Sequence, residues 1–134
     1  MSSLQPELQQ LLSMASRKHV RASATLFCQG DDPAGVYIVL GGKVRLTIRN
    51  PATQAITFDR PAELGSLLGL PAVFGDRPYS MTAEVLEDAE LGFIERKRFL
   101  ALMQGDGQLC MRCLQLLSDE VRIARGAITG DQAT

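Results

Sequence analysis

The residues best suited to bind a ligand lie in the stretch from Gly65 to Ala83. Gly65 and Gly69 stand at a spacing that lets the backbone turn tightly or approach a bulky group. Pro71 can occupy the first turn of a helix, because no intrahelical hydrogen bond requires its missing N–H there. We therefore expect a short helix that runs to about Phe74 and directs its free N–H groups back at Gly69. Free N–H groups at the start of a helix attract anions.

Polar side chains follow this expected helix. Arg77, Tyr79 and Ser80 bring a positive charge, a phenol and a hydroxyl to one loop, and Thr82 leads into the next strand. Together with the glycines, these groups could hold a small anion. A glycine motif alone is a weak signal, so a tight turn and a helix that only caps the core explain the same residues equally well.

Histidine and cysteine do not form a catalytic or metal-binding pattern. His19 is the single histidine, and without ligand-type residues nearby in the sequence we interpret it as a solvated residue at a helix end. Cys110 and Cys113 fall in a helical pattern and could bridge chains or sense oxidation. Small residues that line the core are the favoured interpretation. Since no nucleophile is paired with a base, the sequence predicts a protein that is not an enzyme and holds no metal.

Length and composition indicate one folded domain. The chain has 134 residues, of which 46% are hydrophobic, enough for a packed core. Its net charge of −1 argues against DNA binding by this chain alone, because free-standing nucleic-acid-binding domains are usually strongly basic. The sequence has no apolar run long enough for a membrane span, no signal peptide pattern and an odd number of cysteines. We therefore expect a cytoplasmic protein without membrane contact.

Three regions must position these residues. Residues 1–20 predict an N-terminal helix, with apolar side chains between Leu4 and Lys18 on one face. Residues 21–94 alternate short strands with turn signals, including two runs around Gly41-Gly42 that are typical of a hairpin. Strands at this spacing indicate an antiparallel β sandwich or barrel, in which residues 65–83 form the ligand-binding segment.

Residues 95–134 predict two helices and a polar tail. The first helix spans Glu95 to Met103, and a longer one begins near Gln108. Apolar residues recur in the longer helix at alternating steps of four and three, the pattern of a helix–helix dimer seam. The seam consists of Cys110, Leu114, Leu117, Val121, Ala124 and Ile128. The alternative is a helix that packs only on its own sandwich; we favour a homodimer, because a terminal helix with this strict repeat has little left to cover.

The chain from about Leu4 to Ile128 resembles the effector domain of Crp/Fnr-type regulators, which has the cyclic-nucleotide-binding fold. Residues 30–44, with the sequence GDDPAGVYIVLGGKV, are similar to the early hairpin of that family. Residues 65–82, followed by the stretch from Leu86 to Leu91, are similar to its phosphate-binding cassette and the strands after it. The resemblance implies an antiparallel β jelly roll of eight strands with flanking helices, in which the long terminal helix forms a homodimer.

Two cassette positions depart from the family members that bind cyclic AMP. In those members a glutamate accepts the ribose 2′-hydroxyl and an arginine pairs with the cyclic phosphate, whereas the matching residues here are Leu70 and Tyr79. Leucine cannot accept a hydrogen bond, and tyrosine brings no positive charge. Each lost contact costs about 1.5–3 kcal/mol, which together lowers affinity by roughly a hundred- to many-thousand-fold. Arg77 lies just before the position of the family arginine, and Pro78 restricts its route into the site.

The resemblance therefore implies a sensor domain that keeps the fold without tight cyclic AMP binding. The expected ligand-binding residues are Gly69, Leu70, Arg77, Tyr79, Ser80, Met81 and Thr82. No cofactor is certain, and a cyclic nucleotide or another small anion is the expected effector. Regulators of the family continue into a helix-turn-helix domain, so this sequence is either a segment of a longer regulator or a stand-alone sensor. The alternative function is a structural or interaction module with a vestigial pocket, acting through helix-mediated dimerisation.

Overall fold

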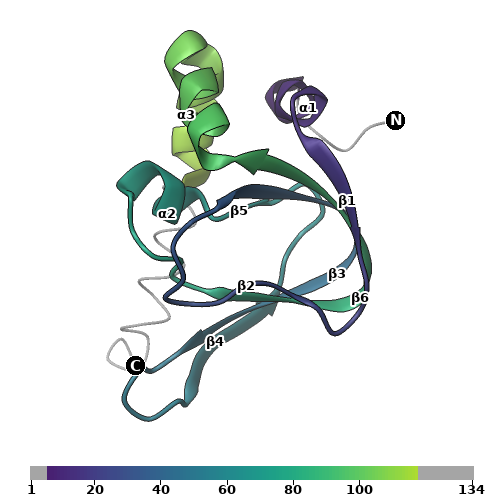
Figure 1. Cartoon of the computed structure of the whole chain (residues 1–134), viewed down its shortest axis with the longest axis vertical. Helices are drawn as coiled ribbons and strands as arrows, with labels where there is room; N and C mark the ends of the chain where they lie inside the picture. Colours follow the sequence, from purple (N-terminus) through teal and green to yellow (C-terminus); the bar gives the residue numbers. More distant parts are fainter. Residues whose placement is uncertain (1–5, 118–134) are drawn as a thin grey trace.

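The computed structural model describes the backbone of residues 6–117 and the side chains of residues 9–117. Within that range, antiparallel strands form one rolled sheet, and the helices gather at one end of the roll (Figure 1). In chain order the elements are α1 (Pro6–Ser13), β1 (Ser16–Val20), β2 (Thr25–Phe27), β3 (Gly35–Arg49), β4 (Ile56–Pro61), β5 (Leu67–Leu68), α2 (Leu70–Gly75), β6 (Thr82–Glu95) and α3 (Arg96–Gly105). Residues 107–117 are also helical. The predicted class, mainly antiparallel β with flanking helices, is confirmed.

Two long strands, β3 and β6, form the spine of the roll. They pair antiparallel from Gly35 opposite Glu95 to Thr47 opposite Thr82. β1 and β2 add to β6, while β4 and β5 add to β3. The register shifts between Val39 and Val44, and such bulges bend and twist a sheet. Dividing β3 and β6 at this bend gives the eight strand segments of a jelly roll.

The hairpin predicted at Gly41-Gly42 is wrong. β3 continues through these glycines without a turn. The glycines form a bulge, and β3 bends there while it stays paired with β6. Gly42 has a φ of 83°, and a Cβ there would collide with the carbonyl oxygen of Asp88 and stand 2.6 Å from the Cα of Ala89. The two glycines therefore allow the partner strand to approach closely. A bulge and a turn both need the backbone freedom of glycine, so the sequence pattern is the same for both.

The N-terminal helix is shorter than predicted. α1 ends at Ser13, and the expected helical residues after Ala15 instead form β1, with Ser16 opposite Phe93 and Val20 opposite Ala89. Most side chains of β1 are exposed, so the strand carries no alternation of apolar and polar residues that would reveal it. Backbone pairing to β6 decides its conformation. His19 is exposed, as predicted, but on this strand rather than at a helix end.

The helices at the end of the roll cover one apolar cluster. It includes Leu11 of α1, Leu70 of α2, Phe99 of α3 and Cys113, all with 0% exposure. Asp106 separates α3 from the next helix and caps it, because its carboxylate accepts a hydrogen bond of 3.1 Å from the backbone N–H of Leu109. This bond lowers the pKa of Asp106, and the side chain amide of Gln10 lowers it further.

The described part of the terminal helix only partly matches the predicted dimer seam. Leu109 and Cys113 are its most buried residues, and the seam residues Cys110 and Leu117 are half-buried against the same apolar cluster. Leu114, also a seam residue, is 39% exposed. Packing on the chain's own domain therefore accounts for part of the apolar pattern. The remaining predicted seam residues, Val121, Ala124 and Ile128, lie outside the described residues.

Candidate functional site

The cassette segment has the backbone that its glycines predict. Gly69 has a φ of 95° and caps α2, with its carbonyl accepting a 3.1 Å hydrogen bond from the N–H of Val73. Pro71 lies in the first turn of α2, as expected, and Asp76 in the left-handed region ends the helix. Gly65, with a φ of 86°, donates its N–H to the carbonyl of Val39 at 2.7 Å. The segment is thus anchored to β3 before it returns to β6.

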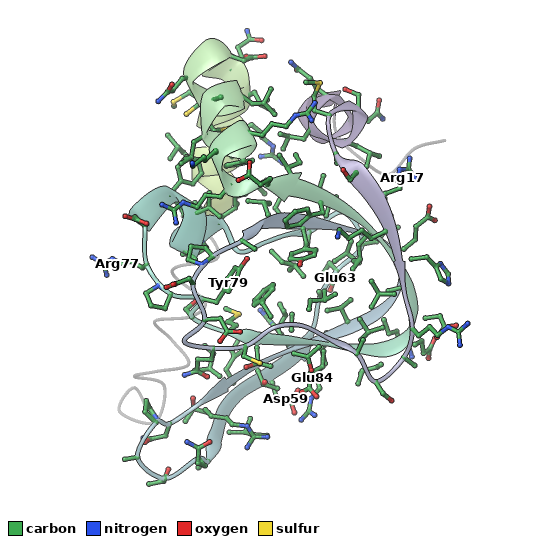
Figure 2. The ribbon with its side chains drawn as sticks, viewed as in Figure 1. Arg17, Asp59, Glu63, Arg77, Tyr79 and Glu84 are labelled. Carbon is green, nitrogen blue, oxygen red and sulfur yellow. The ribbon has the colours of Figure 1, made fainter. Side chains whose placement is uncertain are left out.

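Tyr79 fills the recess that this segment encloses. Its side chain points into the roll and is only 3% exposed (Figure 2). The hydroxyl donates to the carbonyl oxygen of Gly35 at 2.9 Å. It accepts hydrogen bonds from the N–H groups of Ala34 at 3.0 Å and Gly35 at 3.2 Å. One donor and two lone pairs are the full capacity of a phenol, so the group is satisfied by the protein alone.

The ring of Tyr79 is held as firmly as its hydroxyl. It stacks on Phe27 with the ring centroids 3.9 Å apart. On the other side it lies so close to Gly69 that a Cβ there would stand 2.9 Å from the ring carbon Cε1. The space left between Tyr79, Gly69, Ser80 and their neighbours is a cavity of about 10 Å³. That volume holds at most one water molecule.

Two further predicted contacts lie away from the recess. Arg77 is exposed and points away from the roll, on the opposite side of the backbone from Tyr79 (Figure 2). Leu70 is fully buried and packs in the apolar cluster beneath α3, so it does not line the recess as predicted. The first residue of α2 faces the core, where it belongs to the same apolar cluster as Phe99 of α3.

Most of the other predicted residues border the recess, and Thr82 lies behind the segment. Gly69, Tyr79, Ser80 and Met81 all border the small cavity. Met81 is buried and packs on Ile48. The hydroxyl of Thr82 accepts a 2.9 Å hydrogen bond from the backbone N–H of Gln29, so it supports the cassette from behind. The structure therefore brings together four of the seven predicted residues at the recess and separates Leu70, Arg77 and Thr82 from it.

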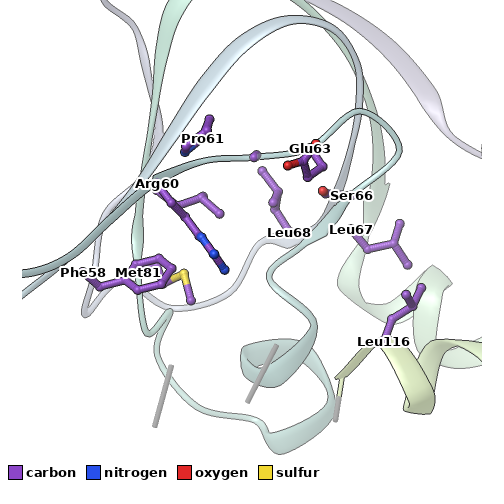
Figure 3. Close-up of a pocket in the computed structure, with 11 residues that line it drawn as sticks. Phe58, Arg60, Pro61, Glu63, Ser66, Leu67, Leu68, Met81 and Leu116 are labelled. Atoms are coloured by element: carbon purple, nitrogen blue, oxygen red, sulfur yellow. The ribbon is translucent and has the colours of Figure 1, made fainter. Parts of the chain in front are cut away.

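A larger cavity, which the sequence did not reveal, lies beside the recess. It has a volume of about 280 Å³ and lies between β4, β5 and the helix of residues 107–117 (Figure 3). Its lining comprises Leu46, Phe58, Arg60, Pro61, Ala62, Glu63, Ser66, Leu67, Leu68, Met81 and Leu116. Leu46, Leu68 and Met81 border both cavities, so the two lie next to each other. The sequence gives no reason to assign Arg60 and Glu63 to a pocket, because their spacing matches no known ligand-binding motif.

The charges around β4 fall into a paired group and an unpaired one. Arg45 grips Asp59 with two hydrogen bonds of 2.9 and 2.7 Å, and this contact lowers the pKa of the Asp59 carboxyl. In the part of the chain that the structure describes, Arg60 makes no ion pair, and its guanidinium lies 5.6 Å from the centre of the Phe58 ring. Arg60 is exposed and brings a positive charge to the lining of the larger cavity.

A metal-binding cluster is missing from the described residues. No group of three or more histidine, cysteine, aspartate or glutamate side chains is placed to hold a metal there. Cys28, Cys110 and Cys113 are all free thiols. Between residues 6 and 117, every helix is too short or too polar to cross a bilayer.

Comparison with known proteins agrees with this architecture. The family model of the cyclic nucleotide-binding domain matches residues 17–106. The catabolite activator protein of Thermus thermophilus is 29% identical, with a TM-score of 0.73 over 92% of this chain and 58% of that protein. The c-di-GMP responsive global regulator CLP of Xanthomonas campestris is 16% identical with a TM-score of 0.76, over 95% of this chain and 62% of that one, which shows the fold alone.

One relative is named as an enzyme. The lysophospholipase NTE1 of Saccharomyces cerevisiae is 30% identical over 126 residues, which cover 84% of this chain. The matching region is 7% of that protein, so the chain spans a small fraction of the length of this relative. The similarity therefore concerns one domain of a much longer protein.

Proposed function

This chain belongs to the cyclic nucleotide-binding domain family, and on that premise we propose that it is a non-enzymatic sensor domain of Crp/Fnr type that does not bind cyclic AMP tightly. One observation carries the proposal: the buried phenol of Tyr79 makes three hydrogen bonds within the protein. The resemblance to the family implies that Tyr79 takes the position of the arginine that pairs with the cyclic phosphate. A cyclic phosphate would have to displace a buried, satisfied side chain and would find no positive charge in its place.

Binding would also lack the second family contact. Leu70 offers no acceptor for a ribose hydroxyl and lies in the core rather than in the recess. Arg77, the nearest cation in the segment, is exposed and directed outward. Moving it inward requires the rearrangement of Pro78 and of the backbone hydrogen bond from Arg77 to Ala72. These features support a fold that is retained while its nucleotide site is closed.

The absence of catalysis is part of the proposal. The relative named as a lysophospholipase matches this chain over 7% of its own length, so its name describes a much longer protein. The described residues of this chain offer no paired nucleophile and base in either cavity. Three free thiols fit a reducing compartment, and we place the domain in the cytoplasm on that ground.

We expect the domain to form a homodimer through its terminal helix. Met111 is 60% exposed and Leu114 is 39% exposed, and both lie on the helix of residues 107–117. An apolar helix face that is exposed within the described residues is a feature of association surfaces. The same observation favours the second candidate function, an interaction module that acts through this helix with no effector. The larger cavity favours the sensor, because a purely structural module has no need of it.

Thermal unfolding tests the proposal. A ligand present at a hundred times its Kd stabilises the folded state by about 2.7 kcal/mol. With cyclic AMP at 100 µM, tight binding would therefore raise the Tm by several degrees, and we expect no change. A clear rise with cyclic AMP, absent with 5′-AMP as the matched control, would contradict the proposal.

A further inference from the structure

We propose that a cavity at the turn between β3 and β4 binds a small polyhydroxy monocarboxylate, such as a sugar acid. This inference rests on the proposed sensor function and gives it an effector that does not need the recess occupied by Tyr79. The turn lies at the end of the roll away from α1 and α3 (Figure 1). The cavity, which we call the turn cavity, has a volume of about 350 Å³ and shares no lining residue with the two cavities described above. Its lining comprises Gln29, Gly30, Arg49, Pro51, Gln54 and Thr82.

Arg49 sets the charge of the ligand. Its guanidinium donates a 3.0 Å hydrogen bond to the carbonyl oxygen of Gln54, and among the described residues it has no acidic partner. The described lining of the turn cavity contains no aspartate or glutamate. A guanidinium can hold a carboxylate with two parallel hydrogen bonds. One cation neutralises one negative charge, so a monocarboxylate is favoured over a phosphate monoester, which carries up to two charges at neutral pH.

The other lining residues set the body of the ligand. Gln29 and Gln54 contribute amides and Thr82 contributes a hydroxyl, while Pro51 is the only apolar side chain in the described lining. Amides and hydroxyls both donate and accept hydrogen bonds, so they suit a hydroxylated body better than an alkyl chain. At about 30 Å³ per water-sized group, the cavity takes roughly a dozen non-hydrogen atoms, the size of a sugar acid such as glucuronate.

The polar groups of the turn cavity are already held in place. The side-chain amide of Gln29 donates to the backbone carbonyl of Arg49 at 2.9 Å and accepts the N–H of Arg49 at 2.8 Å. The amide of Gln54 donates to the carbonyl of Pro51 at 3.3 Å. A primary amide has two N–H groups and two lone pairs, so both glutamines keep capacity for a ligand. Groups that are ordered beforehand lose little conformational entropy on binding, which raises affinity.

The turn cavity adjoins the loop that holds the backbone of Tyr79. The N–H of Gly30 donates to the carbonyl of Tyr79 at 2.9 Å, and the N–H of Tyr79 donates to the carbonyl of Asp31 at 2.9 Å. The backbone N–H of Gln29 donates to the hydroxyl of Thr82 at 2.9 Å. A ligand that contacts Gln29 and Gly30 stabilises these bonds and thereby the cassette. Linkage then requires that an ordered cassette favours the ligand by the same factor.

Titration with glucuronate, followed in nitrogen–proton NMR spectra, tests the proposal. We expect saturable shifts of the side-chain amide resonances of Gln29 and Gln54, with a Kd of about 1 mM or lower for a ligand of this size. Glucose lacks the carboxylate and acetate lacks the hydroxylated body, so each should bind at least about tenfold more weakly. Tighter binding of glucose 6-phosphate than of glucuronate would overturn the assignment of a monocarboxylate.

Variants of Arg49 locate the carboxylate. Arg49→Gln should weaken glucuronate binding about 10- to 100-fold, because it removes a charge-assisted pair. Arg49→Lys keeps the charge but loses the two parallel hydrogen bonds, so its Kd should lie between those of the wild type and Arg49→Gln. Arg98→Gln, which changes an exposed arginine on α3, is the matched control and should leave the Kd unchanged. Urea denaturation verifies that each variant is folded.

Amide hydrogen exchange tests the link to the cassette. Saturating glucuronate should slow exchange at the N–H groups of Gly30 and Tyr79 in the wild type, and unchanged exchange at saturation would overturn this link. Absence of saturable glucuronate binding, or an equal Kd for the wild type and Arg49→Gln, would overturn the whole inference. None of these results touches the proposed function, which fails separately if cyclic AMP binds tightly in a parallel titration.

Discussion

The hydroxyl of Tyr79 donates a 2.9 Å hydrogen bond to the carbonyl oxygen of Gly35, a residue 44 positions earlier in the chain. Gly35 is the first residue of β3, and the same hydroxyl also accepts its N–H. The cassette is therefore tied to the start of the sheet by the side chain of Tyr79. This side chain serves the packing of the chain.

Tyr79→Phe should lower the free energy of unfolding by about 1–3 kcal/mol, because the buried N–H and carbonyl of Gly35 lose their partner. Urea denaturation at 25 °C measures the change. Tyr37→Phe is the matched control, since Tyr37 is half-buried and its hydroxyl makes no hydrogen bond within the described residues. Equal losses for the two variants would mean that the Tyr79 hydroxyl does not anchor the cassette.

Gly69→Ala should also destabilise the fold, by more than about 1–2 kcal/mol. The left-handed backbone at a φ of 95° strains any residue with a Cβ, and that Cβ would stand 2.9 Å from the Tyr79 ring. Gly105→Ala, at the end of α3, has open space around it and should be neutral or slightly stabilising. The prediction is wrong if Gly69→Ala unfolds at the same urea concentration as the wild type.

The thiol of Cys113 should be inert and should contribute a pH-dependent part of the stability. Burial raises its pKa to about 11 from an ordinary value of 9.0. Its folded pKa is the higher one, so this stability is present below pH 9 and is lost as the pH rises through about 11. Wild type should lose more stability between pH 8 and pH 11 than Cys113→Ala, as measured by urea denaturation.

Thiol labelling offers an independent check on the same residue. At pH 8 an aromatic disulfide reagent should react quickly with Cys28, which is exposed, and slowly with Cys113 until the protein is unfolded. Cys28→Ser should remove the fast phase. Rapid labelling of Cys113 in the folded protein would contradict its place in the core and reopen a redox role for the Cys110–Cys113 pair.

Leu114→Asp should convert a dimer to a monomer without unfolding the domain. Leu114 is 39% exposed on the terminal helix, so the added charge remains solvated in the monomer but is buried in a helix–helix interface. Light scattering coupled to gel filtration measures the mass. Leu86→Asp is the control, since Leu86 is 50% exposed on β6, away from the helix. A wild-type monomer at micromolar concentration would remove the dimer from the account.

The class of fold could be predicted from the sequence, because alternating strands, turn residues and helical repeats each leave a local pattern. The path of β3 could not, because Gly41 and Gly42 suit a hairpin and a bulge equally, and only the presence of β6 alongside decides between them. β1 was missed for a related reason: its exposed residues gain their conformation from pairing with β6 and carry no apolar period.

For the candidate site, the sequence predicted which cassette residues depart from the family pattern, but it did not predict where their side chains lie. The resemblance implies that Tyr79 takes the position of the family arginine, and this stays a prediction. The sequence could not place Leu70 in the core. In a short helix, a rotation by one residue is enough to turn a side chain from the pocket to the core. It gave no sign of the cavity at Arg60, since that cavity forms between strands and a helix that are far apart in sequence.

Isothermal titration calorimetry of the wild-type protein with cyclic AMP tests the central claim, that Tyr79 closes the nucleotide site, most directly. The structure leads us to expect no saturable heat of binding at micromolar protein and nucleotide concentrations. A stoichiometric isotherm with a Kd below 1 µM would contradict it, since tight uptake requires the phenol to leave its three hydrogen bonds and another group to neutralise the phosphate.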